Sequence, residues 1–235
     1  PARTMSAIGA NVDNTFVLMA GGRLAAVSTD SATRQKVLDD WWLGEFSCPS
    51  CGDMLWRELS LDSGSELPSS RYGGAMTAHG EDTNVMYFHG GMGTDGVAMQ
   101  DLWEVSVPKN DAIGNSNSGG GSGGKLVFKR LVDDPDGARA FHAMATYRKR
   151  LPFLEGLADD SSNSTTQDQP GDTVWYLLCL GGDSSGAQRL SIYAPHSNDG
   201  AGEWVSILLG QSTTRGMYSR TTAQSSPLSD SKSSL

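Results

Sequence analysis

The sequence predicts an all-β protein assembled from repeated four-stranded units. Three observations support this prediction. An apolar run that ends in Gly-Gly occurs three times, an arginine precedes each run, and an aromatic residue followed three positions later by leucine or isoleucine comes after it. The arginines Arg3, Arg71 and Arg139 recur at an interval of 68 residues. Such a fixed period is typical of repeat architectures, in which each unit buries its hydrophobic face against its neighbours.

The first two strands of each unit are predicted from small residues and from runs of β-forming residues. The arginines are expected to open the first strands, which are predicted within 2–7, 70–76 and 138–145. The second strands are the apolar runs 15–20, 84–89 and 173–180. Because glycine has no Cβ, the Gly-Gly pair after each run predicts a sharp turn that lies close to the neighbouring unit.

The third strand of each unit is predicted from alternating apolar residues, and the fourth from a large aromatic followed three positions later by leucine or isoleucine. The third strands are expected at 42–46, 101–107 and 189–193, and the fourth at 56–59, 128–131 and 204–207. In the first unit Asp40-Trp41-Trp42 replaces the Asp-Leu-Trp of the second, which leaves the start of its third strand open. The closing aromatics Trp56, Phe128 and Trp204 are expected to fill the space between adjacent units.

This order of landmarks resembles the kelch repeat. The resemblance implies a kelch-type β-propeller of about three four-stranded blades, near 1–60, 67–132 and 137–208, with the start of a fourth at 210–220 and a disordered or truncated tail at 221–235. Long loop insertions at 23–38, 47–54, 109–125 and 149–172 explain units longer than the roughly 50 residues of kelch repeats. Because propellers hold four to eight blades, the remaining blades are expected in a longer parent chain. An unrelated β-sandwich is the alternative fold.

Composition bears on the partners of the protein. The formal net charge is −9 and basic residues cluster only at 148–150, so no nucleic-acid partner is expected. The apolar runs are far shorter than the roughly 20 residues of a membrane span, so no membrane partner is expected. The three cysteines form no disulfide framework and no signal peptide precedes the first unit, which makes the cytoplasm the expected location.

Residues with metal-binding or catalytic potential are scattered. Cys48 and Cys51 form a C-x-x-C pair without a second pair, which leaves zinc binding there open. His89 and His142 are expected to pack at blade edges, and Cys179 lies inside a strand with no motif linking it to a tyrosine. The sequence therefore predicts no catalytic residue, no metal ligand and no cofactor.

The resemblance implies a protein–protein interaction module, in which one face of the propeller presents loops to a protein partner. Residues just after Gly-Gly and near the repeated arginines are expected on that face, because rigid sheets hold loops at fixed positions. The candidate partner-binding residues are Arg23, Tyr72, Met92, Phe141, Asp183 and Tyr218. The alternative is the propeller domain of an enzyme such as a copper- or iron-dependent oxidase, although the segment itself is expected not to be catalytic.

Overall fold

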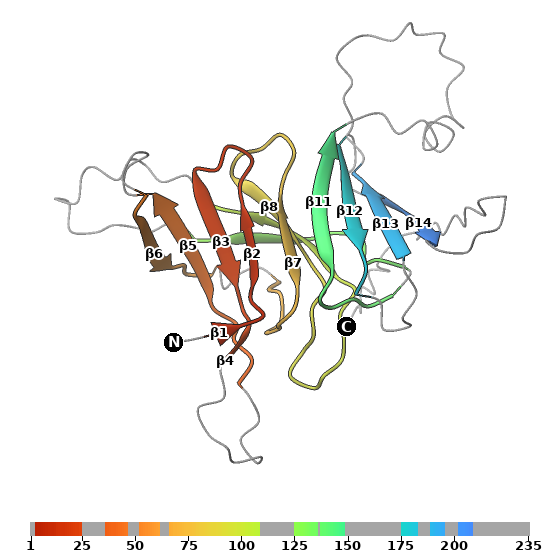
Figure 1. Ribbon diagram of the computed structural model, residues 1–235, viewed down its shortest axis with the longest axis horizontal. Coiled ribbons are helices and arrows are strands. Elements are labelled where there is room, and N and C mark those ends of the chain that lie inside the picture. Colours follow the sequence, from red (N-terminus) through yellow and green to blue (C-terminus); the bar gives the residue numbers. More distant parts are fainter. Residues whose placement is uncertain are drawn as a thin grey trace, which may run out of the picture.

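The regular elements of this chain are β-strands, and the strands pair in antiparallel sheets (Figure 1). The computed structural model describes residues 3–24, 36–46, 52–61, 66–108, 125–135, 137–148, 175–182, 189–195 and 202–208. Within these ranges there are three four-stranded sheets and one two-stranded sheet, and no helix. The all-β prediction is confirmed at this level.

Each four-stranded sheet is a simple meander in which consecutive strands are neighbours. The first contains β2 (Ala7–Ala10), β3 (Phe16–Ala20), β5 (Trp41–Phe46) and β6 (Met54–Glu58). The second contains β7 (Ala75–Ala78), β8 (Val85–His89), β9 (Leu102–Ser106) and β10 (Val127–Arg130). The third contains β11 (Ala143–Arg148), β12 (Trp175–Leu180), β13 (Arg189–Ala194) and β14 (Glu203–Leu208). The short strands β1 (Arg3–Thr4) and β4 (Arg23–Leu24) form the two-stranded sheet.

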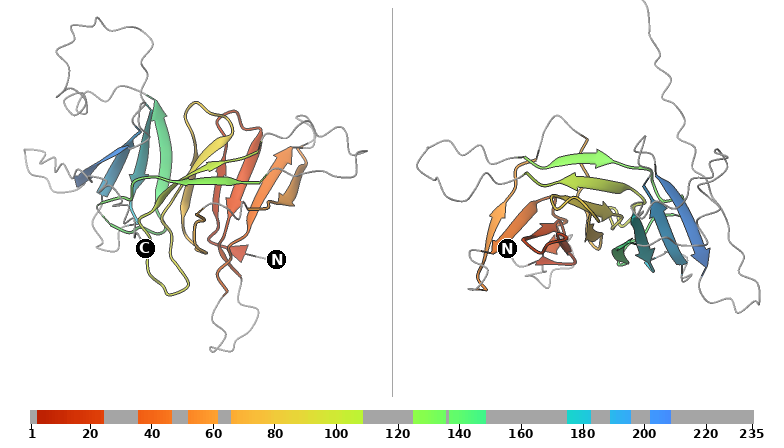
Figure 2. Two further views of the ribbon diagram at one scale, coloured as in Figure 1. Left: turned by 180° about the vertical axis from the view of Figure 1, so that it is seen from behind. Right: turned by 90° about the horizontal axis from the view of Figure 1, so that it is seen from above.

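The three large sheets spread from a common centre, as the view from above in Figure 2 shows. Their first strands lie side by side at that centre, because β7 contacts both β2 and β11. The last strands β6, β10 and β14 lie at the outer ends of the fan. In the described part of the chain the sheets form an open fan and not a closed ring.

Two hydrophobic clusters fill the spaces between adjacent sheets. The first cluster joins the inward faces of β3 and β5 to those of β8, β9 and β10, and Leu18, Trp41 and Phe88 are among its members. The second joins the opposite face of the second sheet to β12, β13 and β14. Side chains in a strand alternate between two faces, so β8 sends Met86 and Phe88 into the first cluster and Tyr87 into the second. The second sheet is therefore buried on both faces.

The closing aromatics divide according to their surroundings. Phe128 and Trp204 are 6% and 1% exposed, and each packs against the preceding sheet, Phe128 on Trp41 and Trp204 on His89. Trp56 is 41% exposed, so the prediction that it is buried between units is wrong. It pairs with Gly44 on the face of the first sheet that points away from the second sheet, where no preceding sheet is described.

The structure also corrects several local expectations. Arg71 and Arg139 lie before β7 and β11 and not in the first strands themselves, and Arg139 forms an isolated bridge with Met99. Arg23 belongs to β4 and not to a loop, because it pairs with Thr4 and also forms a bridge with Val37. In the first unit the third strand begins at Trp41.

Some predicted features lie outside the described residues. They are Cys48, Cys51, Asp183, Tyr218, the fourth unit at 210–220 and the tail at 221–235. No helix that could cross a membrane is present in the part of the chain that is described.

Truncating the closing aromatics tests these packing assignments. We expect Trp204→Ala to lower the free energy of unfolding by about 3–5 kcal/mol, because it leaves a cavity in a filled core. Trp56→Ala should cost less than about 1 kcal/mol, because a large part of its side chain is already in water. Urea denaturation of both variants measures the difference, and equal losses would contradict the assignment.

Candidate partner-binding face

An arginine at the head of each sheet holds that sheet's turns together. In the second sheet the Arg71 guanidinium donates to both carboxylate oxygens of Asp101 and to the carbonyl oxygen of Gly90. Asp101 also accepts a 2.6 Å hydrogen bond from the indole of Trp103. Because Arg71 and Asp101 are almost completely buried, each charge needs the other for compensation.

The first sheet repeats this arrangement residue for residue. Arg3 donates to both carboxylate oxygens of Asp40 at 2.8 and 2.7 Å and to the carbonyl oxygen of Gly21 at 3.2 Å. Trp42 donates to the same Asp40 carboxylate at 2.8 Å. Asp40-Trp41-Trp42 is therefore the structural equivalent of Asp-Leu-Trp in the second unit.

The third sheet obtains its carboxylate from a different place. Arg189 occupies the position of Asp101, since its carbonyl oxygen accepts from Gly181 just as that of Asp101 accepts from Gly90. Arg139 donates instead to Asp134, at 2.9 Å, and to the hydroxyl of Ser191. Arg139 still reaches the carbonyl oxygen of Gly181 at 3.3 Å. Asp134 precedes the arginine, so the sequence pattern of the first two units gave no sign of this replacement.

The backbone of the same arginines joins one sheet to the next. The carbonyl oxygen of Arg71 accepts from the N–H of Gly22 at 2.9 Å, and that of Arg139 accepts from Gly91 at 2.7 Å. A Cβ at Gly21 or Gly90 would lie 2.4 or 2.5 Å from these oxygens, and both glycines have positive φ angles of 56° and 59°. Gly-Gly is thus required both for the turn and for the approach of the next sheet.

Two residues after each arginine, the chain takes a left-handed conformation. Met5, Gly73 and Phe141 have φ angles of 59°, 65° and 59°. Consecutive backbone hydrogen bonds link them, because Gly73 N–H donates to the Met5 carbonyl at 2.8 Å and Phe141 N–H to the Gly73 carbonyl at 2.7 Å. Glycine adopts this conformation readily, whereas a large side chain pays of order 1–3 kcal/mol for it. The Met5 and Phe141 side chains are nevertheless 49% and 56% exposed.

Four of the six candidate partner-binding residues lie together on this face. The Arg23 guanidinium lies 4.4 Å from the centre of the Tyr72 ring, whose hydroxyl is 2.9 Å from Met92 Sδ. The rings of Tyr72 and Phe141 are 5.9 Å apart. The Phe141 ring also covers Gly73, where an added Cβ would lie 2.6 Å from it. Sequence reasoning missed Met5, although its position two residues after Arg3 matches that of Phe141 after Arg139.

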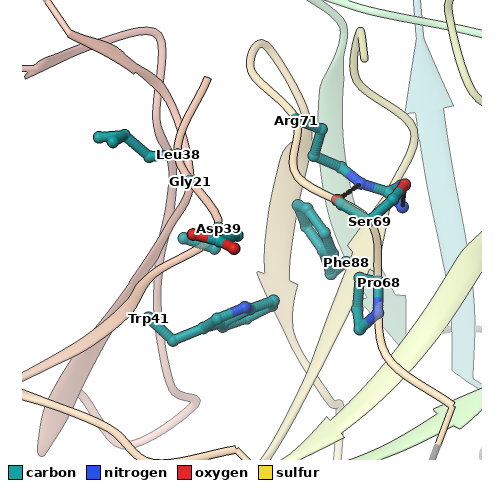
Figure 3. Close-up of a pocket in the computed structure, with 9 residues that line it drawn as sticks. Gly21, Leu38, Asp39, Trp41, Pro68, Ser69, Arg71 and Phe88 are labelled. Atoms are coloured by element: carbon teal, nitrogen blue, oxygen red, sulfur yellow. Dashed lines mark hydrogen bonds between the residues drawn. The ribbon is translucent and has the colours of Figure 1, made fainter. Parts of the chain in front are cut away.

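A small pocket lies beside this network, between the first and second sheets (Figure 3). Leu38, Asp39 and Trp41 line one side of it, and Arg71 and Phe88 the other. It has room for about one water molecule, which is too little for an organic ligand.

The histidines that were expected at blade edges meet between the second and third sheets. His89 Nδ1 and His142 Nε2 are 2.9 Å apart, and one ligand atom from each of His89, His142 and Cys179 lies within 4.8 Å of the others. These three side chains are the residues of the described chain that are placed to hold a metal ion together.

No protein-family model matches this chain, and no curated protein matches it either.

The buried Arg71–Asp101 pair predicts a dependence of stability on pH. Burial alone would raise the pKa of Asp101, but hydrogen bonds from Arg71, its charge, and the hydrogen bond from Trp103 lower it below the ordinary value of 3.8. A carboxyl whose pKa falls on folding stabilises the folded state above its unfolded pKa, and this stabilisation is lost as the pH drops through the folded pKa.

We therefore expect the free energy of unfolding to fall as the pH is lowered below about 4. In Asp101→Asn, which cannot titrate there, this part of the decline should be absent, and the variant should be less stable at neutral pH because Arg71 loses its counter-charge. Urea denaturation from pH 7 to pH 2.5 measures both effects. Parallel pH profiles for the two proteins would contradict the prediction.

Proposed function

We propose that this chain is part of a kelch-type β-propeller and that its role is to bind a protein partner through the face carrying Arg23, Tyr72, Met92 and Phe141. The observation that carries the proposal is a pair of exposed apolar side chains, Met5 and Phe141, held in a costly backbone conformation on a hydrogen-bonded frame. The cytoplasm stays the expected location, and the oxidase-like alternative stays a prediction.

The repeated junction between sheets supports the propeller. The contacts from Gly-Gly to the next arginine recur at both junctions, with the same donor and acceptor atoms. Phe128 and Trp204 each pack on the sheet before their own, so the second and third sheets contact their predecessors through the same closing strand. Repetition of one junction geometry generates a radial array, as in propellers.

The outward face of the first sheet supports a further neighbour. Trp56 lies on it, and Ile8 and Phe46 also point to this side and are exposed. If the same junction geometry repeats, a preceding blade would pack on this face of the first sheet. Trp56 would then contact that blade as Phe128 contacts Trp41. A sheet face with exposed large apolar side chains is typical of an interaction surface.

Self-association of the 235-residue chain tests this part of the proposal. If the Trp56 face is a blade junction without its neighbour, the chain should associate through it, and Trp56→Glu should shift the population toward monomer. Val127→Glu, on the exposed side of an outer strand, is the matched control and should leave the distribution unchanged. Sedimentation velocity measures the populations, and a wild-type chain that is monomeric at all concentrations would contradict the proposal.

The partner-binding face has the residue types that dominate protein interfaces. Arginine is enriched among residues that contribute most to binding, and exposed aromatic anchors such as Phe141 enter pockets of the partner. Tyr72 is buried beneath Arg23 and Phe141 and supports them. Met5 and Phe141 offer apolar contact, while Arg23 is a cation beside them whose Nε is buried without a hydrogen-bond partner in the described residues. These features fit a protein segment with an apolar side chain flanked by a carboxylate.

Phe141→Asn separates binding from stability. Asparagine tolerates the left-handed conformation better than phenylalanine, so the melting temperature should stay the same or rise. The loss of the aromatic anchor should weaken partner binding at least tenfold, which is the effect expected of an interface hot spot. The matched control is Val127→Asn, at a residue with a similar exposed fraction of 50% on β10.

The experiment compares which proteins bind to the wild-type chain and to each variant under identical conditions. A protein that binds is then purified and titrated against all three chains. A partner retained by the wild type and by Val127→Asn, but not by Phe141→Asn, supports the proposal. Equal retention by all three contradicts it. A drop in the melting temperature of Phe141→Asn would show instead that the Phe141 ring serves packing on Tyr72 and Gly73.

A further inference from the structure

Two imidazoles and one thiol converge in the space between the second and third sheets. His89 is the last residue of β8, His142 lies just before β11, and Cys179 is in β12. His89 and Cys179 are completely buried and His142 is nine-tenths buried. Their ligand atoms lie within 4.8 Å of one another, although the residues are up to 90 positions apart in sequence.

The two histidines cannot satisfy each other's hydrogen-bonding needs. A neutral imidazole has one N–H and one lone pair, so a single hydrogen bond between His89 Nδ1 and His142 Nε2 uses only one donor and one acceptor. The remaining atoms, His89 Nε2 and His142 Nδ1, are buried without a partner in the described structure. Such orphaned groups are rare in native proteins and often mark a missing ion or water.

Between the first and second sheets, different side chains occupy the corresponding positions. The positions of His89, His142 and Cys179 correspond there to Ala20, Gly74 and Phe88, by their spacing from Gly-Gly and from the repeated arginine. The Phe88 ring fills that space, since a Cβ on Gly74 would lie 2.8 Å from it. At these positions the contact between the first and second sheets is therefore made by apolar residues alone.

The protonation states of the three groups suit metal binding. Burial, followed by the charge of Arg139, lowers the pKa of His142 to about 4, and burial chiefly lowers that of His89 well below its ordinary value. Both imidazoles are therefore neutral at pH 7 and have lone pairs to offer. Burial raises the pKa of the Cys179 thiol, so a metal must displace its proton.

We propose that His89, His142 and Cys179 form a buried site for one copper(I) ion that ties the second sheet to the third. Thiolate and imidazole are ligands that soft metals prefer. On binding, the Cys179 S–H proton is released to solvent and the sulfur forms a bond to copper, with no change in oxidation state. One Cu⁺, one thiolate and two neutral imidazoles have no net charge.

The surroundings favour this ion over zinc. The cluster around Cys179 contains Leu102, Leu177, Tyr193 and Trp204, and burying a net charge among such side chains is costly. Zn²⁺ with the same ligands would keep a net charge of +1, and its structural sites usually have four ligands. The nearby carboxylate of Asp134 is already bonded to Arg139.

The test uses the 235-residue chain in which Cys48 and Cys51 are replaced by serine, because that pair is a competing thiol site and Cys179 is the only other cysteine. Copper is supplied as Cu(I) in two ways, during expression and anaerobically to the purified protein against a colorimetric Cu(I) chelator. We expect one copper per chain in C48S/C51S and less than a tenth of that in C48S/C51S/C179A.

Two controls separate metal binding from folding. Cys179→Ala replaces a small buried side chain by another, and its circular dichroism spectrum should match that of the parent protein. His142→Gln, in the same background, keeps a hydrogen-bonding group beside His89 and should weaken copper binding at least tenfold. Copper should raise the melting temperature of the parent protein and of its Phe141→Asn variant, but not that of either ligand variant.

X-ray absorption at the copper edge should find one sulfur and two nitrogen neighbours. Three results would each overturn the proposal: no bound copper in C48S/C51S by either route, copper binding unaffected by Cys179→Ala, or retention of zinc in preference to copper. The site is independent of partner binding, because Phe141→Asn keeps all three ligands. Failure of one proposal therefore leaves the other standing.

Discussion

The arginine at the head of each sheet is the residue on which the rest of the structure depends. Its guanidinium holds the glycine turn of its own sheet, and the carbonyl oxygens of Arg71 and Arg139 accept a hydrogen bond from the glycine pair of the preceding sheet. A buried guanidinium without a carboxylate would be strongly destabilising, so each of these arginines requires an aspartate within hydrogen-bonding distance. Asp40 and Asp101 each lie immediately before the third strand of their sheet, whereas Asp134 comes from the segment before Arg139.

The two junctions between sheets share this framework but differ in what fills them. The first junction is packed with aromatic side chains, and Trp41 contacts both Phe88 and Phe128 edge to face. The second junction has His89 and His142 in the corresponding place, with Trp204 against His89. Because the backbone contacts from the glycine pair to the next arginine recur at both junctions, the junctions differ in their side chains: aromatic rings fill the first, and two imidazoles and a thiol meet in the second.

The face that carries Met5, Tyr72 and Phe141 owes its rigidity to the same arginines. Each left-handed residue follows its arginine by two positions, and the backbone hydrogen bonds from Phe141 to Gly73 and from Gly73 to Met5 join all three sheets. The exposed side chains of Met5 and Phe141 are thus fixed by the centre of the fan, and the buried Tyr72 ring packs beside Phe141. Binding through such a preorganised surface loses little conformational entropy.

The sequence by itself determined the strands and their grouping, because alternating apolar residues, Gly-Gly pairs and closing aromatics act over a few residues. It also predicted that Arg23, Tyr72, Met92 and Phe141 lie close together, since equivalent positions in repeats share a location, but it did not show that Tyr72 is buried. Only the tertiary structure decided that Trp56 is exposed while Trp204 is buried, because that depends on whether a neighbouring sheet is present. The meeting of His89, His142 and Cys179 was equally invisible, because it depends on how two sheets pack and not on any local spacing.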